Sequence, residues 1–200
     1  MLNKRILAPG IVIYKTDPNQ TEKILEKVKK DLTDQWHVSE VVNTSDYSDE
    51  INLFRQCQDC GIDSNILKNG SQELKDLYLD TKSWIDPELN DFVAMYGVEE
   101  LTTGPYVYIK YEQTDTFGHH VDDGKKFPRT VSISAYLNDN YEGGELEFKH
   151  FGITIKPQAG DIVVFSSAFP YMHKVHPVTS GTRYAVVAWY RYATYPEIMN

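Results

Sequence analysis

The second half of the chain constrains the fold most, because it reads as a series of short β-strands separated by turn residues. Val107, Ile109 and Tyr111 alternate with Tyr108 and Lys110, and residues 130–137 alternate in the same way. Such a period of two is typical of half-buried strands. Further strands are predicted over residues 145–148, 152–156, 161–165 and 184–190. Many short strands at close spacing indicate an antiparallel sandwich or barrel.

The first half of the chain has a different residue pattern, which predicts helices. Residues 11–14 look like a strand, after which Asp17 can cap a helix that has Pro18 in its first turn. Apolar residues then follow at helical spacing, so an amphipathic helix is predicted over residues 18–33. They are Ile24, Leu25, Val28 and Leu32.

A second helix is predicted over residues 71–97, with its apolar residues on one side. These are Leu74, Leu77, Tyr78, Trp84 and Ile85. Asp86-Pro87 predicts either a kink or a fresh helix start within this stretch. Residues 36–70 have weak periodicity and are expected to be irregular or partly extended. The predicted fold class is therefore mainly β with N-terminal helices (α+β), in which the helices pack outside a jelly-roll core.

Bulk composition excludes several classes of protein. The net charge is −9 with a pI of about 5.1, which disfavours general nucleic-acid binding, although a local basic groove stays possible. Mean hydropathy is −0.45, and no apolar run approaches the roughly 20 residues of a membrane span. Pro9-Gly10 interrupts the N-terminal apolar stretch, and no small-residue cleavage site follows. The expectation is a cytoplasmic protein without membrane contact, in a host that is either cellular or viral.

The two cysteines, Cys57 and Cys60, form a CxxC spacing. A redox or metal role would require an activating helix N-terminus or a second cysteine pair, and the sequence shows neither. Two reduced thiols in a loop are the favoured interpretation.

The segment Gly118–Asp123 concentrates side chains of the kind that bind metals. On an extended strand, His120 and Asp122 would point to the same face. A third ligand would have to come from elsewhere, and the later histidines are His150, His173 and His176. Two histidines with one carboxylate form the arrangement of non-haem Fe(II) oxygenases. Alone, however, the spacing is a weak signal, and a polar loop is the favoured interpretation.

Arg183 follows His173 by ten positions in a β-rich region. A dicarboxylate co-substrate needs a fixed cation at its far end, and arginine binds a carboxylate bidentately while staying charged. The competing interpretation is an ordinary surface ion pair.

Taken together, residues 108–190 resemble the catalytic core of 2-oxoglutarate/Fe(II) oxygenases, specifically the prolyl 4-hydroxylase-like group. The resemblance lies in the order and spacing of Tyr111, His120, Asp122, Arg129, Tyr136-Leu137-Asn138, Gly143-Gly144-Glu145-Leu146, Phe148, Gly160-Asp161, His173, Val175, Pro177-Val178, Gly181, Arg183 and Trp189. It implies a double-stranded β-helix with supporting helices. The chain is then expected to be one domain, with residues 1–100 as N-terminal support and residues 101–195 as the catalytic core.

The resemblance also implies roles for individual residues. The implied iron ligands are His120, Asp122 and His173, and Arg183 would hold 2-oxoglutarate together with Tyr136 and Tyr111. Arg129 and Trp189 would contact the substrate, although Trp189 fits a core position equally well. Gly143-Gly144 would form a tight turn at positive φ. The remaining histidines do not fit the ligand pattern; they are His37, His119, His150 and His176.

The implied activity is hydroxylation of a substrate C–H by Fe(II), 2-oxoglutarate and O₂, with ascorbate as a reductant. A prolyl residue in a peptide or protein is the first expectation, and a free amino acid or another small molecule is the second. A non-catalytic jelly-roll module is disfavoured by the complete triad with Arg183. A nucleic-acid demethylase is disfavoured because Trp189 stands where that group has a second arginine. Phe117 also departs from the tyrosine of many peptidyl-proline hydroxylases, which leaves the substrate open.

Overall fold

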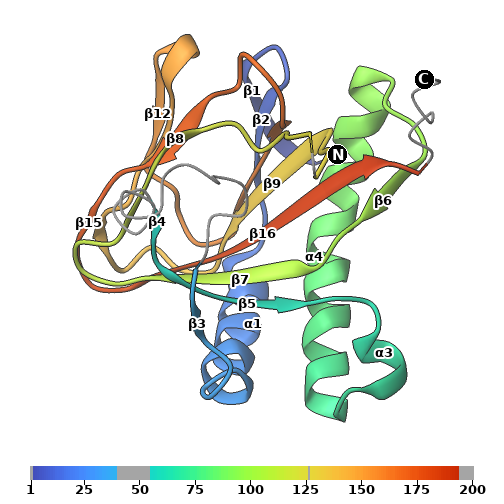
Figure 1. Cartoon of the computed structure of the whole chain (residues 1–200), viewed down its shortest axis with the longest axis vertical. Coiled ribbons are helices and arrows are strands. Elements are labelled where there is room, and N and C mark those ends of the chain that lie inside the picture. Colours follow the sequence, from blue (N-terminus) through green and yellow to red (C-terminus); the bar gives the residue numbers. More distant parts are fainter. Residues whose placement is uncertain (1, 40–54, 126, 194–200) are drawn as a thin grey trace.

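Two antiparallel sheets pack against each other in the computed structural model, which describes residues 2–39, 55–125 and 127–193 (Figure 1). In spatial order, the larger sheet consists of β1 (Asn3–Ala8), β2 (Ile11–Lys15), β13 (Asp161–Ser166), β9 (Val131–Tyr136), β16 (Arg183–Tyr192), β7 (Tyr106–Tyr111), β5 (Gln58–Ile62) and β3 (His37–Val38), with β6 (Leu101–Thr103) paired to β16. The smaller sheet consists of β12 (Ile153–Ile155), β11 (Leu146–Phe148), β14 (His173–Val175), β8 (Thr116–His120) and β4 (Arg55–Gln56). A separate pair is formed by β10 (Glu142–Gly143) and β15 (Val178–Ser180). The prediction of a mainly β fold is confirmed.

The helices cover the outer face of the larger sheet. They are α1 (Pro18–Asp31) and α4 (Gln72–Tyr96), and the short α3 (Ile66–Asn69) precedes α4. The 3₁₀ turn η1 (Lys149–Phe151) lies instead between β11 and β12 of the smaller sheet. The predicted cap is present, because the Asp17 side chain accepts a hydrogen bond from the amide of Asn19. In the part of the chain that the structure describes, no helix is both long and apolar enough to cross a membrane.

Helix α4 runs without interruption through Pro87, so the predicted fresh helix start is wrong. Proline inside a helix costs about 3 kcal/mol. The buried residues Trp84, Ile85 and Leu89 surround it, and their packing on the sheet offsets this cost. The helix ends at Gly97, whose left-handed φ of 64° suits glycine.

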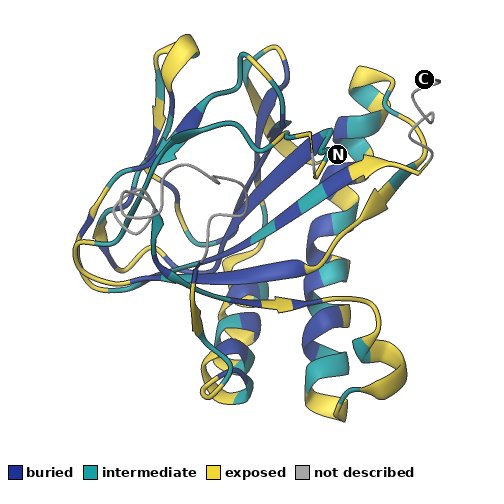
Figure 2. Ribbon diagram, viewed as in Figure 1, coloured by how far each residue is buried: buried dark blue, intermediate teal, exposed yellow. Residues whose placement is uncertain are grey.

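Residues of the central strands are buried (Figure 2), and alternation along β2 divides the core into two layers. Val12 and Tyr14 pack with the helices, whereas Ile11 and Ile13 face the interior between the sheets. Five large aromatic residues of the β-rich half are buried in these layers; they are Tyr106, Tyr108, Tyr136, Phe148 and Phe165.

Residues 36–70 contain the extended pieces that were expected, namely β3, β4 and β5, although residues 40–54 lie outside the described part. Cys57 and Cys60 are both free and buried. The placement of both in a loop is wrong for Cys60, because β5 pairs with β7 and carries this residue into the sheet.

Candidate active site

His120 and His173 lie opposite each other on β8 and β14 and face the interior between the two sheets. They are direct partners in the strand register, and their ring centroids are 4.2 Å apart. Each Nδ1 lies near a backbone carbonyl, at 2.8 Å from Gly118 O and 3.1 Å from Tyr171 O. A carbonyl only accepts, so each Nδ1–H donates, and both Nε2 lone pairs are left for a metal.

Asp122 completes the set from just beyond the end of β8. Its Oδ1 is 3.5 Å from His120 Nε2, and its Oδ2 is 3.7 Å from His173 Nε2. One ligand atom from each of the three side chains lies within 4.8 Å of the others, so they can share one ion. The predicted trio is therefore together, but strand alternation is not what places it. β8 ends at His120, and the amide of Asp122 is instead fixed by Ser167 O at 3.0 Å.

A chain of hydroxyl groups orients the Asp122 carboxylate. Ser132 Oγ donates to Asp122 Oδ2 at 2.7 Å, and Ser167 Oγ lies 2.7 Å from Ser132 Oγ. Since the Ser132 hydrogen is used on Asp122, Ser167 donates to Ser132. Such outer partners are what hold metal ligands in a productive orientation.

The protonation states also suit metal binding. Burial lowers the pKa of His173 to about 4, with help from His120 and only partial opposition from Asp122. Burial by itself would raise the pKa of Asp122, but His173, His120 and Ser132 outweigh it and hold this pKa well below the usual range. At neutral pH, His173 is therefore neutral and Asp122 is ionised, as metal ligands must be.

The three side chains line a pocket that is also lined by Arg183, Tyr111 and Trp189. Arg183 is 2% exposed, and its guanidinium lies 4.7 Å from the Tyr111 ring centroid and 4.9 Å from that of Tyr136. No carboxylate among the described residues pairs with Arg183, and its Nε and the Tyr136 hydroxyl have no hydrogen-bond partner there. A buried cation in this state favours an anionic ligand. The expectation of a surface ion pair is excluded by its burial.

The glycine pair creates room for this arginine. Gly143 and Gly144 adopt φ of 72° and 67°, which confirms the predicted tight turn. A Cβ on Gly144 would lie 2.9 Å from Arg183 Cδ. Tyr141 lies just before this turn, and its hydroxyl is buried without a hydrogen-bond partner among the described residues. Burial raises the pKa of Tyr141 to about 12, against the opposing effect of the Arg183 charge.

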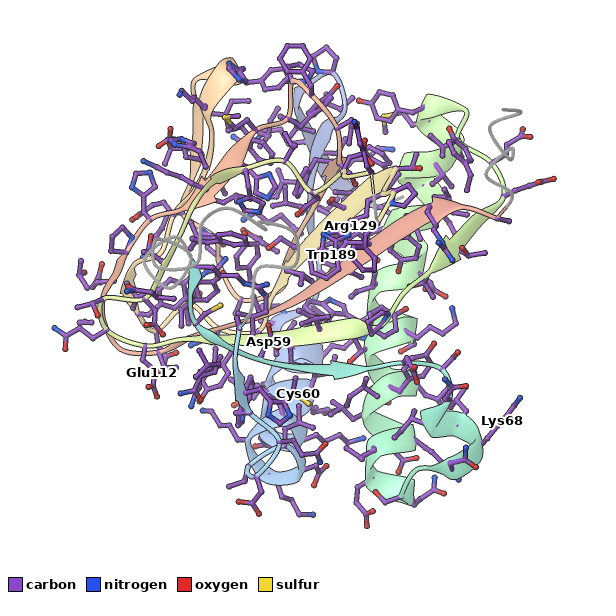
Figure 3. All side chains as sticks on the ribbon, in the orientation of Figure 1. Asp59, Cys60, Lys68, Glu112, Arg129 and Trp189 are labelled. Atoms are coloured by element: carbon purple, nitrogen blue, oxygen red, sulfur yellow. The ribbon has the colours of Figure 1, made fainter. Side chains whose placement is uncertain are left out.

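Arg129 and Trp189, the two predicted substrate contacts, lie together (Figure 3). The Arg129 guanidinium is 3.9 Å from the Trp189 ring centroid, and its Nη1 donates to Asp122 O at 3.3 Å. Trp189 is partly buried and lines the pocket, so it belongs to the wall and not to the closed core.

The other histidines of the core point elsewhere. His119 and His176 bond to Glu147 on the outer face of the smaller sheet, at 3.2 and 2.8 Å. His150 lies in η1 against the ring of Phe169. His37 lies in β3, at the far edge of the larger sheet. Among the described residues, only the predicted trio forms a cluster that could hold a metal.

Three residues of the pocket region received no place in the site from the sequence, although Phe117 was noted as a departure from the family pattern. Arg55 lines the pocket from β4, and its guanidinium lies 5.0 Å from the Phe117 ring centroid. Phe117 in turn stacks on His120 at 3.7 Å. Tyr141 is the third. No sequence signal marked Arg55, because its segment has no clear periodicity.

Comparison with known proteins supports the same assignment. The family model of the 2OG-Fe(II) oxygenase superfamily matches residues 106–191, which contain the whole trio and Arg183. The β-rich second half of the chain is therefore similar to this superfamily. A PKHD-type hydroxylase of Cupriavidus pinatubonensis is 36% identical to this chain over 97 residues, covering 42% of each chain. Another, from Rippkaea orientalis, is 37% identical over 92 residues, covering 42% of this chain and 40% of that one. The matched segment thus spans 42% or less of these relatives.

Solved structures share the fold over almost the whole chain. A prolyl hydroxylase of Trichoplax adhaerens, solved with a peptide fragment of hypoxia inducible factor, superposes with a TM-score of 0.72 at 20% identity, covering 90% of this chain and 83% of that one. A prolyl-4-hydroxylase of Pseudomonas putida gives 0.66 at 21% identity, covering 92% and 94%. At this level of identity the likeness establishes the fold alone.

Proposed function

We propose that this chain is a Fe(II)- and 2-oxoglutarate-dependent dioxygenase that hydroxylates a substrate C–H, with a prolyl residue in a peptide or protein as the favoured target. The observation that carries the proposal is one pocket that contains both a metal-type trio and an unpaired buried arginine. The prolyl hydroxylase titles of the structural neighbours and the PKHD-type names of the relatives support the choice of reaction. A free amino acid or another small molecule is the alternative substrate, because Phe117 lacks the hydroxyl of many peptidyl-proline hydroxylases.

His120 Nε2, His173 Nε2 and the Asp122 carboxylate would hold the iron. The donor set fits, because two imidazoles and a carboxylate on one face are the arrangement used for non-haem Fe(II), with positions left open. Bound Fe(II), with 2-oxoglutarate and O₂, supplies the oxidising power that inserts one oxygen atom into the substrate while 2-oxoglutarate becomes succinate and CO₂.

Arg183 would bind the far carboxylate of 2-oxoglutarate. Its guanidinium is held between two tyrosine rings, so it is already positioned before binding. The hydroxyl groups of Tyr136 and Tyr141 are buried, have no hydrogen-bond partner within the described ranges of the chain, and would donate to the same carboxylate. Tyr111 covers one face of the arginine, and Phe165 and Val187 help to exclude water from the pocket.

Arg129 and Trp189 stand beside Asp122 and would position the substrate against the metal. The stacked guanidinium lowers the freedom of both side chains, and the partial exposure of Arg129 leaves it accessible to a ligand. The proposed domain remains the whole chain, with residues 101–195 as its catalytic part.

The test is succinate release from 2-oxoglutarate by the full chain with Fe(II) and ascorbate, measured by mass spectrometry. We expect release that a chelator abolishes and that Asp122→Ala lacks. The matched control is Glu147→Ala, which removes a carboxylate from the opposite face of the same sheet and should retain release. Equal signals from the wild type, the chelated sample and Asp122→Ala would refute the proposed activity.

Calorimetry separates the two halves of the site. Arg183→Ala should bind Fe(II) as the wild type does but lose 2-oxoglutarate by about ten-fold or more, since charge-assisted hydrogen bonds contribute about 1.5–3 kcal/mol. A panel of proline-containing peptides and free amino acids, read for the gain of one oxygen, then distinguishes the two kinds of substrate.

A further inference from the structure

A single lysine, Lys156, binds the backbone of the turn that contains Gly143 and Gly144. Lys156 directly follows β12, and its Nζ donates to Tyr141 O at 3.1 Å and to Gly143 O at 2.6 Å. An ammonium group has three N–H donors, so one lysine can hold two carbonyls at the same time. The Glu145 Oε1 atom lies 3.9 Å from the same nitrogen. Lys156 therefore joins the end of β12 to this turn.

The backbone pairing that holds this turn is short. The ladder between β10 and β15 consists of two residue pairs, and its register shifts between them. The amide of Gly144 adds one further bond, to Pro177 O at 3.1 Å. Glycine loses more conformational freedom on folding than any other residue, and this turn has two in succession. Its conformation therefore depends on a side chain from outside the turn.

The turn lies against the buried end of the proposed co-substrate site. A Cβ on Gly144 would be 2.9 Å from Arg183 Cδ and 3.0 Å from Tyr141 Cε2, so this glycine touches both side chains. Tyr141 is 3% exposed, and Lys156 Nζ lies 4.5 Å from its ring centroid, which is a cation–π distance. Lys156 thus contacts Tyr141 twice, at the carbonyl and at the ring. A shift of the turn would move Tyr141 relative to Arg183.

We propose that Lys156 is a positioning residue for the co-substrate, because it fixes the turn so that the Tyr141 hydroxyl and the Arg183 guanidinium bind the far carboxylate of 2-oxoglutarate together. This role rests on the proposed function and adds to it a residue that acts through another. The Lys156 side chain is 39% exposed, whereas Tyr141 and Arg183 are buried. Its removal would cost preorganisation of the site, which is measured as weaker binding.

The first test is calorimetry of 2-oxoglutarate with the full chain and Fe(II), without oxygen. Lys156→Met removes the charge and the donors but keeps an apolar side chain of similar length. We expect about five-fold weaker binding of 2-oxoglutarate, a similar rise in its KM for succinate release, and a kcat within about two-fold of the wild type. The Fe(II) affinity should stay at the wild-type value, because Lys156 contacts none of the three proposed iron ligands.

Two further variants separate positioning from a general loss of charge. Lys156→Arg should restore most of the affinity, since a guanidinium can also donate to two carbonyls. Lys27→Met is the matched control, because Lys27 is 36% exposed and pairs with Asp80, which joins α1 to α4 in the helical layer. This control should bind 2-oxoglutarate as the wild type does. Thermal unfolding of each variant checks that the fold is retained.

A double variant tests whether Lys156 acts through Tyr141. Tyr141→Phe keeps the ring and removes the hydroxyl, and it should weaken 2-oxoglutarate binding by about ten-fold, as expected for a hydrogen bond to a charged group. If Lys156 only positions that hydroxyl, Lys156→Met should add little to the loss in Tyr141→Phe. A double variant whose loss equals the product of the two single losses would overturn this role.

The remaining outcomes distinguish this role from the proposed function. If the wild type binds 2-oxoglutarate and Lys156→Met binds it equally well, the positioning role is wrong and the dioxygenase stands. A parallel loss of Fe(II) and 2-oxoglutarate affinity in Lys156→Met would also overturn the role, because it indicates general disruption of the fold. If the wild type does not bind 2-oxoglutarate, the proposed function fails and the positioning role fails with it.

Discussion

Two sets of histidines and carboxylates lie on opposite faces of the smaller sheet, and only one of them is arranged to bind a metal. On the inner face, His120 and His173 converge on Asp122, which is 7% exposed. On the outer face, His119 and His176 bond to Glu147, which is 23% exposed. The residue types are the same, so residue type alone does not define a metal site.

What differs is how the polar atoms are satisfied. On the outer face, both oxygens of Glu147 already accept hydrogen bonds or ion pairs, from His119 on one side and from His176 and Lys174 on the other. On the inner face, each histidine uses Nδ1 on the backbone and leaves Nε2 for a ligand. Burial and outer hydrogen bonds therefore prepare the inner set for a cation, while the outer set is complete in itself.

The largest expected effect comes from the two carboxylates, Asp122 on the inner face and Glu147 on the outer face. Asp122→Asn should weaken Fe(II) binding by more than about 100-fold, because even outer partners of metal ligands contribute about 10–100-fold. Glu147→Gln should leave the Fe(II) affinity unchanged. Anaerobic titration of both variants checks the pair, and a similar loss in each would show that the faces are not distinct.

A smaller loss of Fe(II) affinity is expected from replacing the serine that orients the Asp122 carboxylate. Ser132→Ala removes the hydroxyl that donates to Asp122 Oδ2. We expect Fe(II) affinity to fall by about ten-fold with the fold retained, because the carboxylate loses its orienting partner. Circular dichroism measures the fold, and metal titration measures the Fe(II) affinity. Wild-type affinity in this variant would show that the Ser132 hydroxyl does not contribute to metal binding.

How far the sequence predicts the site depends on the range of the interactions. The trio and Arg183 were predictable because they occupy fixed spacings within residues 108–190. Arg55 was not, since it enters the pocket only through the pairing of β4 with β8, about 60 residues along the chain. Tyr141 was likewise hidden, because its relation to Arg183 depends on the positive-φ turn that folds β10 against β15.

The fold shows the same division. The helix over residues 18–33 was predicted from local periodicity and is observed as α1. The continuity of α4 through Pro87 was not predicted, because tertiary packing around Trp84 and Leu89 offsets a local preference. Local patterns thus predicted the elements, and long-range contacts decided their ends and partners.

The smallest expected effect concerns stability and belongs to the outer face. Burial by itself would raise the pKa of Glu147, but bonds from His119, Lys174 and His176 lower it to about 2 from its ordinary value of 4.5. A lowered pKa means that the stabilisation is present above the ordinary value and is lost as pH falls toward 2. Glu147→Gln should therefore cost no more than about 1 kcal/mol at pH 6, as for a partly exposed ion pair.

The difference in unfolding free energy between the wild type and Glu147→Gln should shrink between about pH 4.5 and 2. Denaturant unfolding at a series of pH values measures it. A difference that stays constant across this window would contradict the ion-pair account of the outer face.

The most direct test of the account replaces two histidines three residues apart that lie on opposite faces. Fe(II) is titrated without oxygen into His173→Ala and His176→Ala, with folding checked by circular dichroism. We predict that His173→Ala loses more than about 100-fold in affinity, since it removes a ligand and not an outer partner, while His176→Ala binds as the wild type does. Equal affinities in the two variants, whether both retained or both lost, would contradict an iron site formed by His120, Asp122 and His173.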